Sequence, residues 1–494
     1  MYTKLKKVLE ITNSNDYFYK NFFNPINDLY KMKKYFLSIF AILFFANLSY
    51  SQLANQNTNL LSQLDEHGTS YSALWGYTAT DGREYAILGC QTGTAFIDIT
   101  DSTNIHEVDF ISGLSSSWRE MKTYSHYAYV VSEATNSKLQ IMDLQYLPDS
   151  VVLVDTWSYA GYTKTHSIQQ AGQYLYLNGG NAATSVGGVA VVDVTNPTTP
   201  VKLGEWSTEY VHDCRILNDT IWASNIYSGR ISIINATNKS SLQFVRNFQA
   251  YPTQEVSAHN SAFTADRKYI YSTNEISSPN GRLFIYNIED INNITFVREW
   301  QPTGITTAIV HNVEIYGNLA VIAHYRAGIR ILDITNGGNP TEVAWYDTYP
   351  QNNNSSYSGC WGVYMFPSGK IIGSDISGGL FTISLKNVLT GISNNYLNSV
   401  PDNFSLSQNY PNPFNPSTTI KFTINQHSKV KLSLYDVSGI KIADLINDTR
   451  DGGSYEFRLD AGKYNISSGT YFYKLESDNS SGTSTETKKM ILIK

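Results

Sequence analysis

Apolar and polar residues alternate over most of the chain, and one alternating segment returns at regular steps. Each copy runs through alternating apolar residues to a polar residue that begins a turn. Alternation with a period of two residues is typical of β-strands with one buried face. The equivalent turn positions are Asp98, Asp143, Asp193, Asn235, Asn287, Asp333 and Ser384. The chain therefore contains an internal repeat whose copies are one small sheet in length.

Each repeat unit divides into four predicted strands. In the sixth unit the strands are residues 311–316, 319–323, 328–334 and 341–347. Gly317-Asn318 and residues 336–340 join them with residues that favour tight turns. The 3.6-residue period of an amphipathic helix is absent from the pattern. Seven such units predict an all-β chain that contains a seven-bladed β-propeller.

The seventh unit lacks a fourth strand, because the chain continues after Leu385 into a polar linker at residues 386–402. Residues 59–65 precede the first unit and have the character of a fourth strand, like residues 201–206 in the third unit. We therefore expect the N-terminal segment to complete the last blade. This closure makes residues 52–385 one ring without an open sheet edge between its ends.

A short apolar run near the N-terminus predicts secretion. Residues 36–48 are apolar, follow two lysines and lead to the sequence Ser-Tyr-Ser. The run is too short to cross a bilayer of about 30 Å, so it indicates a cleavable signal peptide at about residues 32–51 and no transmembrane segment. The whole signal region is residues 1–51, and translation starts at either Met1 or Met32.

The C-terminal part has a different pattern. Residues 403–416 are rich in proline, so they are expected to be extended. Residues 418–424, 429–436 and 469–475 then alternate polar and apolar side chains as half-buried strands do. Residues 403–494 are predicted to form a small Ig-like β-sandwich.

The turns of the repeat carry a family resemblance. Ile97–Thr100 and Leu332–Thr335 read IDIT and LDIT, and Val192–Pro197 reads VDVTNP. With these turns the units resemble the LVIVD-repeat proteins, and residues 53–385 resemble the choice-of-anchor B family. That resemblance implies one propeller body held by varying anchors, and it implies no particular reaction.

The C-terminal part carries a second, more specific resemblance. Its matching segments are Asn409–Pro416, Tyr435–Gly439, Gly469–Tyr473 and Lys488–Met490. With them, residues 403–494 closely resemble the type A sorting domain of the type IX secretion system. The resemblance implies a Bacteroidetes-type organism, the type IX machinery as a partner, and a secreted or outer-membrane surface location. It also implies that the domain is usually removed by proteolysis, with attachment of the protein to a surface glycolipid.

Composition bears on three further questions: nucleic-acid binding, disorder, and the state of the cysteines. The net charge is −6 and no basic stripe appears, so nucleic acid is not an expected partner. A hydrophobic content of 42% with only 16% charged residues indicates a folded chain. Cys90, Cys214 and Cys360 form no CxxC pair, which excludes a disulfide framework and a structural zinc knot. One disulfide or three buried thiols remain open.

Polar and aromatic residues recur where the first strand of each unit begins. Four units have a histidine followed by a small polar residue, and three have a tryptophan. Because the first strand of a blade lines the central channel, these side chains should form a ring around its axis. The loops between second and third strands return to the same face and contribute Glu133, Asn178, Asn225, Glu275, His324 and Asp375.

Three interpretations of this face remain open. In the first, each histidine is structural and hydrogen-bonds the neighbouring blade. In the second, a divalent metal lies in the central channel, because imidazole and carboxylate are common metal ligands. The candidate ligands are His166, His212, His259, His311, His324 and Glu275. In the third, a metal-free pocket binds an extracellular ligand. The candidates for this pocket are Trp75, Trp118, Arg119, Glu133, Trp361 and Asp375.

The sequence favours binding over catalysis. It has no nucleophile elbow, HExxH motif, P-loop or dinucleotide fingerprint. Paired carboxylates at repeat-related positions, which glycosidase chemistry needs, are not evident. We expect an exported propeller that binds an extracellular glycan, peptide or protein. The alternative is a metal-dependent extracellular lyase or hydrolase with its site in the channel, an analogy at the level of the fold alone.

Overall fold

The structure is a computed structural model that describes most of the chain from residue 55 onward. The described residues are 55–68, 70–184, 186–251, 257–276, 281–386, 404–424, 428–450, 453–464, 466–479 and 482–493. The predicted signal peptide, both alternative start residues and all of the linker except Lys386 lie outside them.

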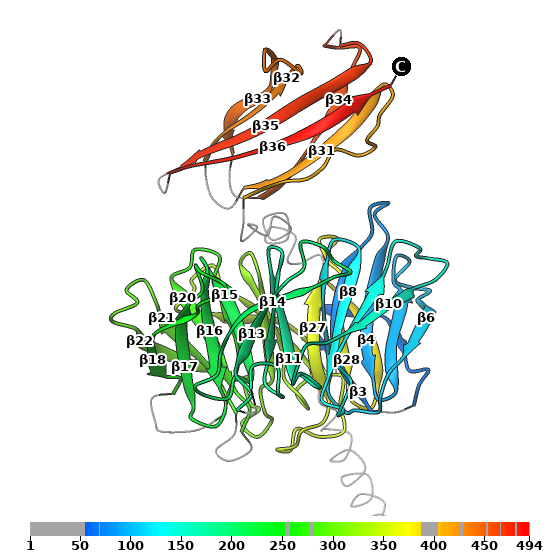
Figure 1. The fold of residues 1–494 in the computed structure, drawn as a ribbon. Coiled ribbons are helices and arrows are strands. Elements are labelled where there is room, and N and C mark those ends of the chain that lie inside the picture. Colours follow the sequence, from blue (N-terminus) through cyan, green and yellow to red (C-terminus); the bar gives the residue numbers. More distant parts are fainter. Residues whose placement is uncertain are drawn as a thin grey trace, which may run out of the picture. The chain divides into compact units, whose positions relative to one another are not determined.

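The described residues are all-β, as the alternation predicts, and they contain no helix. In particular, they contain no helix long and apolar enough to span a membrane. Up to residue 385 the strands form seven antiparallel sheets that stand next to one another (Figure 1).

Four of these sheets come first along the chain. Their strands are β3 (Tyr71–Thr78), β4 (Glu84–Cys90), β5 (Gly93–Asp98) and β6 (His106–Ser112); β7 (Arg119–Tyr124), β8 (Tyr127–Ser132), β9 (Leu139–Asp143) and β10 (Val152–Trp157); β11 (Ser167–Ala171), β12 (Tyr174–Asn178), β13 (Val189–Asp193) and β14 (Val201–Trp206); and β15 (Asp213–Leu217), β16 (Thr220–Asn225), β17 (Arg230–Asn235) and β18 (Gln243–Gln249).

The other three sheets follow, and two of them recruit strands from the N-terminus. Their strands are β19 (Ala258–Phe263), β20 (Tyr269–Asn274), β21 (Leu283–Asn287) and β22 (Thr295–Trp300); β23 (Asn312–Tyr316), β24 (Leu319–Ala323), β25 (Ile329–Asp333) and β26 (Thr341–Tyr346) with β1 (Asn55–Gln56); and β27 (Cys360–Met365), β28 (Ile371–Asp375) and β29 (Gly379–Leu385) with β2 (Thr58–Leu64).

The first strands of the sheets form a closed ring. β3, β7, β11, β15, β19, β23 and β27 contact one another in that order, and β27 contacts β3. Residues from all seven of these strands line one cavity. The sheets therefore surround a common centre, which is the arrangement of a β-propeller.

The predicted closing strand is confirmed. β2 pairs antiparallel with β29, from Thr58 opposite Leu385 to Leu64 opposite Leu380. A further strand was not foreseen: β1 pairs with the outer edge of β26, and Thr58 Oγ1 donates a 2.8 Å hydrogen bond to the carbonyl of Trp345. The N-terminal segment thus joins two neighbouring sheets.

The repeated Asp or Asn has a structural role, because its side chain caps the turn after the third strand. Oδ1 of Asp98, Asp193 and Asp333 each accepts a hydrogen bond from the backbone N–H two residues later, at 2.7–2.8 Å. Asn235 and Asn287 do the same. This is an Asx-turn, in which the side chain replaces a backbone acceptor.

Replacing Asp333 by Ala is therefore expected to lower the free energy of unfolding by about 1 kcal/mol, the usual value of one hydrogen bond. Asp333→Asn is the matched control and should be nearly neutral, since two units of the same chain already use Asn at this position. Urea unfolding of both variants measures the difference. Equal stability of the two variants would contradict the capping role.

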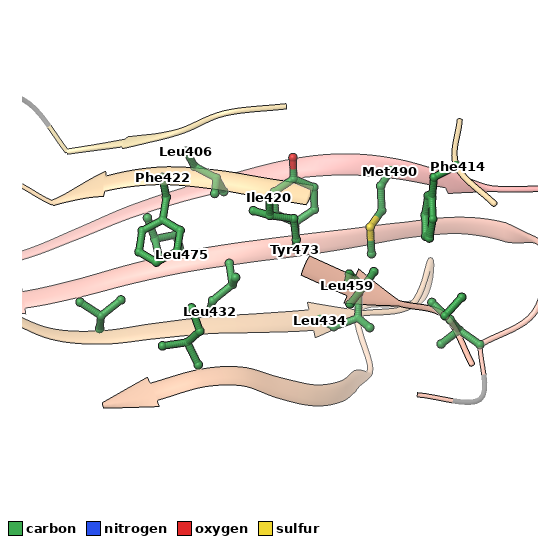
Figure 2. Close-up of a cluster of buried hydrophobic side chains, with 14 of the residues drawn as sticks. Leu406, Phe414, Ile420, Phe422, Leu432, Leu434, Leu459, Tyr473, Leu475 and Met490 are labelled. Atoms are coloured by element: carbon green, nitrogen blue, oxygen red, sulfur yellow. The ribbon is translucent and has the colours of Figure 1, made fainter. Parts of the chain in front are cut away.

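Residues 404–493, as far as they are described, form two further sheets. One contains β30 (Ser405–Leu406), β31 (Ser417–Ile424) and β34 (Gly453–Asp460), and the other contains β33 (Lys441–Arg450), β32 (Ser428–Tyr435), β35 (Gly469–Asn479) and β36 (Gly482–Leu492). Alternate side chains from both sheets meet in one apolar core, including Phe422, Leu432, Leu475 and Met490 (Figure 2). The basic segment near the C-terminus belongs to β36, which pairs along its whole length with β35.

The cysteines are three buried free thiols. Of the two alternatives that the sequence left open, the disulfide is thereby removed. Burial raises the pKa of the Cys90 thiol to about 12, so it stays protonated at neutral pH.

Candidate functional site

Four histidine rings lie in a row along the cavity at the centre of the ring. The ring centroids of His166 and His212 are 4.0 Å apart, those of His212 and His259 are 4.2 Å apart, and those of His259 and His311 are 4.4 Å apart. The row ends at Trp361, whose ring centroid is 4.8 Å from that of His311. The cavity is narrow, with a volume of about 30 Å³.

The repeat places these rings, because each histidine occupies an equivalent backbone position. The N–H groups of His166, His212 and His311 each donate to a carbonyl at the end of the second strand of their own unit, at 2.9–3.0 Å. The same side-chain direction therefore recurs in successive blades. The structure thus brings the four histidine rings together.

Two of the rings are fixed by backbone carbonyls of the next unit. Nδ1 of His259 donates to the carbonyl of His311 at 3.1 Å, and Nδ1 of His311 donates to the carbonyl of Trp361. A carbonyl can only accept, so Nδ1 carries the hydrogen in both rings. In a neutral ring the lone pair is then on Nε2.

Burial keeps the central imidazoles neutral. Removal from water lowers the pKa of His212 and His259 well below the usual value, and it lowers the pKa of His311 to about 3. Burial is the largest influence on the pKa of His212, and the backbone of His259 raises it only in part. Nδ1 of His212 has no hydrogen-bond partner among the described residues.

Glu275 faces the lone pairs of two histidines. Its Oε2 is 3.4 Å from Nε2 of His259, and its Oε1 is 3.8 Å from Nε2 of His311. The Tyr325 hydroxyl donates to Oε1. Burial raises the pKa of Glu275 to about 7. Ligand atoms of His212, His259 and Glu275 all lie within 4.8 Å of one another.

His166 is held differently from the other three. Its Nδ1 is 2.8 Å from Oε1 of Glu133, and this hydrogen bond lowers the pKa of the Glu133 carboxyl. Glu133 is therefore an orienting partner of His166.

Aromatic rings border the cavity at the Trp361 end. The ring centroids of Trp118 and Trp361 are 6.1 Å apart and the rings meet edge to face, while Trp118 is 43% exposed. Tyr325 lies edge to face with Trp361 on one side and with the half-exposed Tyr357 on the other. Exposed aromatic edges beside buried polar groups are a common arrangement in ligand sites.

A layer of charged side chains lies next to the histidines. Arg215 and Glu314 form an ion pair at 2.6 Å, Lys122 Nζ is 3.3 Å from Glu120, and Asn260 donates to Asp213. These residues line a second cavity together with Trp75. Lys122 Nζ lies 4.0 Å from the centroid of the Trp75 ring, so Trp75 serves as a cation–π partner within this layer.

Two predicted residues, Asp375 and Arg119, make structural hydrogen bonds. Asp375 is buried, where it accepts hydrogen bonds from the Thr348 hydroxyl and from two backbone N–H groups of its own turn. It is the last residue of β28 and does not line the cavity. The Arg119 guanidinium borders the cavity but donates to the carbonyls of Cys90 and Leu114.

His324 is buried outside the histidine row. Its ring lies edge to face with Trp300, and neither ring nitrogen has a partner among the described residues. The residue that reaches the site from this loop is the following one, Tyr325, which sequence reasoning missed. Its φ of 27° is unusual for a residue with a side chain.

The charged layer was also missed, although a signal was present. Glu120, Asp213 and Asn312 are followed two residues later by Lys122, Arg215 and Glu314. Residues two apart in a strand share a face, so this spacing predicts a second polar layer in the channel.

Comparisons with known proteins identify two parts of the chain. The family described as the secretion system C-terminal sorting domain matches residues 408–494, and the LVIVD repeat family matches residues 163–208 and 309–348. The chain therefore contains LVIVD repeats in a β-propeller and a type IX sorting domain, which directs export to a secreted or cell-surface location. No curated protein matches the sequence.

Solved structures with a similar fold are only distantly related. U3-55K has a TM-score of 0.47 at 9% identity, over 67% of this chain and 98% of that one. The WD40 β-propeller domain of Doa1 has a TM-score of 0.46 at 11% identity, over 66% and 96%. A hypothetical selenium-binding protein from Sulfolobus tokodaii has a TM-score of 0.45 at 11% identity, over 87% and 93%. At these values the likeness carries no argument about activity.

Proposed function

We propose that this chain is an exported binding module, in which a seven-bladed propeller holds an extracellular ligand at one mouth of its central channel. In this proposal residues 52–385 are the propeller, residues 386–402 are a linker, and residues 403–494 are an Ig-like sorting sandwich behind a cleaved signal peptide at about residues 32–51. Seven sheets, the ring of first strands and the β2–β29 pairing support the blade count. The body is proposed to be of the choice-of-anchor B type, with attachment to a surface glycolipid after the sorting domain is removed.

One observation carries the binding role: the exposed Trp118 and the half-buried Trp361 stand together beside a buried polar cavity. Trp118 and Trp361 line that cavity together with His311 and Asn312. Aromatic rings supply apolar area to a ligand, and the polar groups behind them supply direction. This combination suits a glycan best among the extracellular ligands, since a sugar ring has an apolar face and polar edges. Peptides and proteins are the other classes to be tested.

The Trp118→Ala variant tests this proposal. We expect it to lose at least about tenfold in affinity for the bound ligand, as truncation of an aromatic anchor costs more than about 1.4 kcal/mol. Its melting temperature should stay close to that of the unmodified protein, because Trp118 is exposed. Binding is measured first on glycan arrays and then on peptide libraries.

Tyr146→Ala is the matched control, since Tyr146 is an exposed aromatic residue in the turn after β9 and does not line the cavity. It should bind as the unmodified protein does. Equal binding by Trp118→Ala and Tyr146→Ala would refute the proposed site.

A second candidate function is a metal-dependent lyase or hydrolase. The observation in its favour is the approach of Glu275 to two imidazoles. Turnover of an extracellular polymer that requires both added divalent metal and His259 would support this alternative over simple binding.

A further inference from the structure

Two histidine nitrogens and one carboxylate in the cavity lack a hydrogen-bond donor between them. Nε2 of His259 and Nε2 of His311 carry lone pairs, because Nδ1 donates its hydrogen to a carbonyl in both rings. Both lone pairs face oxygens of Glu275, at 3.4 and 3.8 Å. A buried carboxylate and two imidazole acceptors therefore meet here, which is unfavourable unless a proton on Glu275 or a metal ion lies among them.

We infer that His212, His259 and Glu275 form a binding site for one divalent transition-metal ion of the zinc class. Two imidazoles and one carboxylate are a ligand set that catalytic zinc sites use. The inference is independent of the ligand proposed for the tryptophan pair.

The geometry fits an ion of this size. In a tetrahedral site with metal–ligand bonds of about 2.1 Å, neighbouring ligand atoms lie about 3.4 Å apart. The distance between His259 Nε2 and Glu275 Oε2 is 3.4 Å. The third ligand, His212, has an atom within 4.8 Å of both, so a small rotation of its ring completes the set.

The surroundings resemble an outer shell that orients metal ligands. A metal-bound histidine usually donates its other ring N–H to a carbonyl or carboxylate, which fixes the ring and the tautomer. His259 does so through the His311 carbonyl. The Tyr325 hydroxyl fixes Glu275 in the same way, from a residue whose backbone φ of 27° is strained.

The remaining coordination position opens toward the cavity. His212, His259 and Glu275 all line it, as does His311. A water molecule, or an oxygen of a ligand that enters past Trp118, would take this position. The class of ion follows from the donors: nitrogen with one carboxylate selects Zn²⁺, Co²⁺, Ni²⁺ or Cu²⁺ over Ca²⁺ and Mg²⁺.

Metal titration of the full-length protein, purified without a polyhistidine tag and stripped with a chelator, tests the inference. We expect one Zn²⁺ per chain by calorimetry, and Co²⁺ should give the intense visible absorption of a four-coordinate site. His259→Gln and Glu275→Gln should each weaken Zn²⁺ binding at least about 100-fold, since even outer-shell changes cost 10–100-fold. Both substitutions keep a polar side chain of similar size.

His324→Gln is the matched control, because His324 is equally buried but lies outside the cavity lining. It should bind Zn²⁺ as the unmodified protein does. If His259→Gln fails to fold, as judged by thermal melting, the Glu275→Gln variant decides alone. Absence of stoichiometric Zn²⁺ binding, or unchanged binding by a folded Glu275→Gln, would overturn the site. Trp118→Ala should retain Zn²⁺, which separates this result from the test of glycan binding.

Discussion

Removal of residues 55–64 is expected to lower the melting temperature of the protein by more than about 10 °C, or to prevent folding altogether. These residues contain β2, which supplies the outer strand of the last sheet. Without it, the outer edge of β29 loses a ladder of six residue pairs. The last sheet then keeps only three strands and ends at β29 with its outer edge unpaired, and an unpaired edge strand favours aggregation and slippage. Differential scanning calorimetry of the truncated chain measures the effect.

A shorter truncation is the control for this experiment. A chain that starts at residue 57 loses β1 but keeps β2, so it gives up only a two-residue pairing with β26. We expect its melting temperature to fall by a few degrees at most. If both truncations melt together with the full-length protein, β2 does not close the ring.

The Glu314→Ala variant is expected to lose about 3 kcal/mol of stability, the usual cost of leaving one member of a buried ion pair without its partner. Arg215 is largely buried in the charged layer, with 13% of its side chain exposed, and Glu314 accepts its hydrogen bond at 2.6 Å. Once the carboxylate is gone, the guanidinium keeps only carbonyl acceptors, such as that of Val313, and more distant charges. Urea unfolding at constant salt measures the loss.

Two controls define the origin of that loss. The double variant Arg215→Met/Glu314→Leu removes both charges and should be closer to the unmodified protein than Glu314→Ala is, because apolar pairs can replace buried ion pairs. Asp444→Ala removes a largely exposed partner of Lys441 and should cost less than about 1 kcal/mol. A Glu314→Ala variant as stable as Asp444→Ala would contradict the proposed role of the charged layer.

Much of the architecture was predictable because each repeat unit contains the same local turn signal. The Asx-turns at Asp98, Asp193 and Asp333 recur with the period of the sheets, and each marks where the third strand ends. The closing strand β2 was predictable because a missing fourth strand had to be supplied from elsewhere. β1 was not, since two residues carry no period and their position depends on the edge of β26.

The site was predictable only in part. The histidines share one backbone position in the repeat, so their convergence follows from the register. The register does not determine which residue of each loop reaches the histidines, because a shift of one residue reverses the direction of a side chain in a strand. Asp375 accepts hydrogen bonds within its own turn, whereas Glu275 reaches the histidines. In the loop after β24, the unusual φ of Tyr325 determines which residue points toward the histidines.

The pairing of β2 with β29 also determines when the molecule can fold. The first strand of the ring to be synthesised can pair only after the last one has been made, because Thr58 lies opposite Leu385. A contact over such a sequence separation closes late and slowly, after the intervening sheets have formed. Until residue 385 has been synthesised, β2 lacks part of its partner strand and the ring stays open. Pairing of the N-terminal segment therefore depends on synthesis of the whole ring.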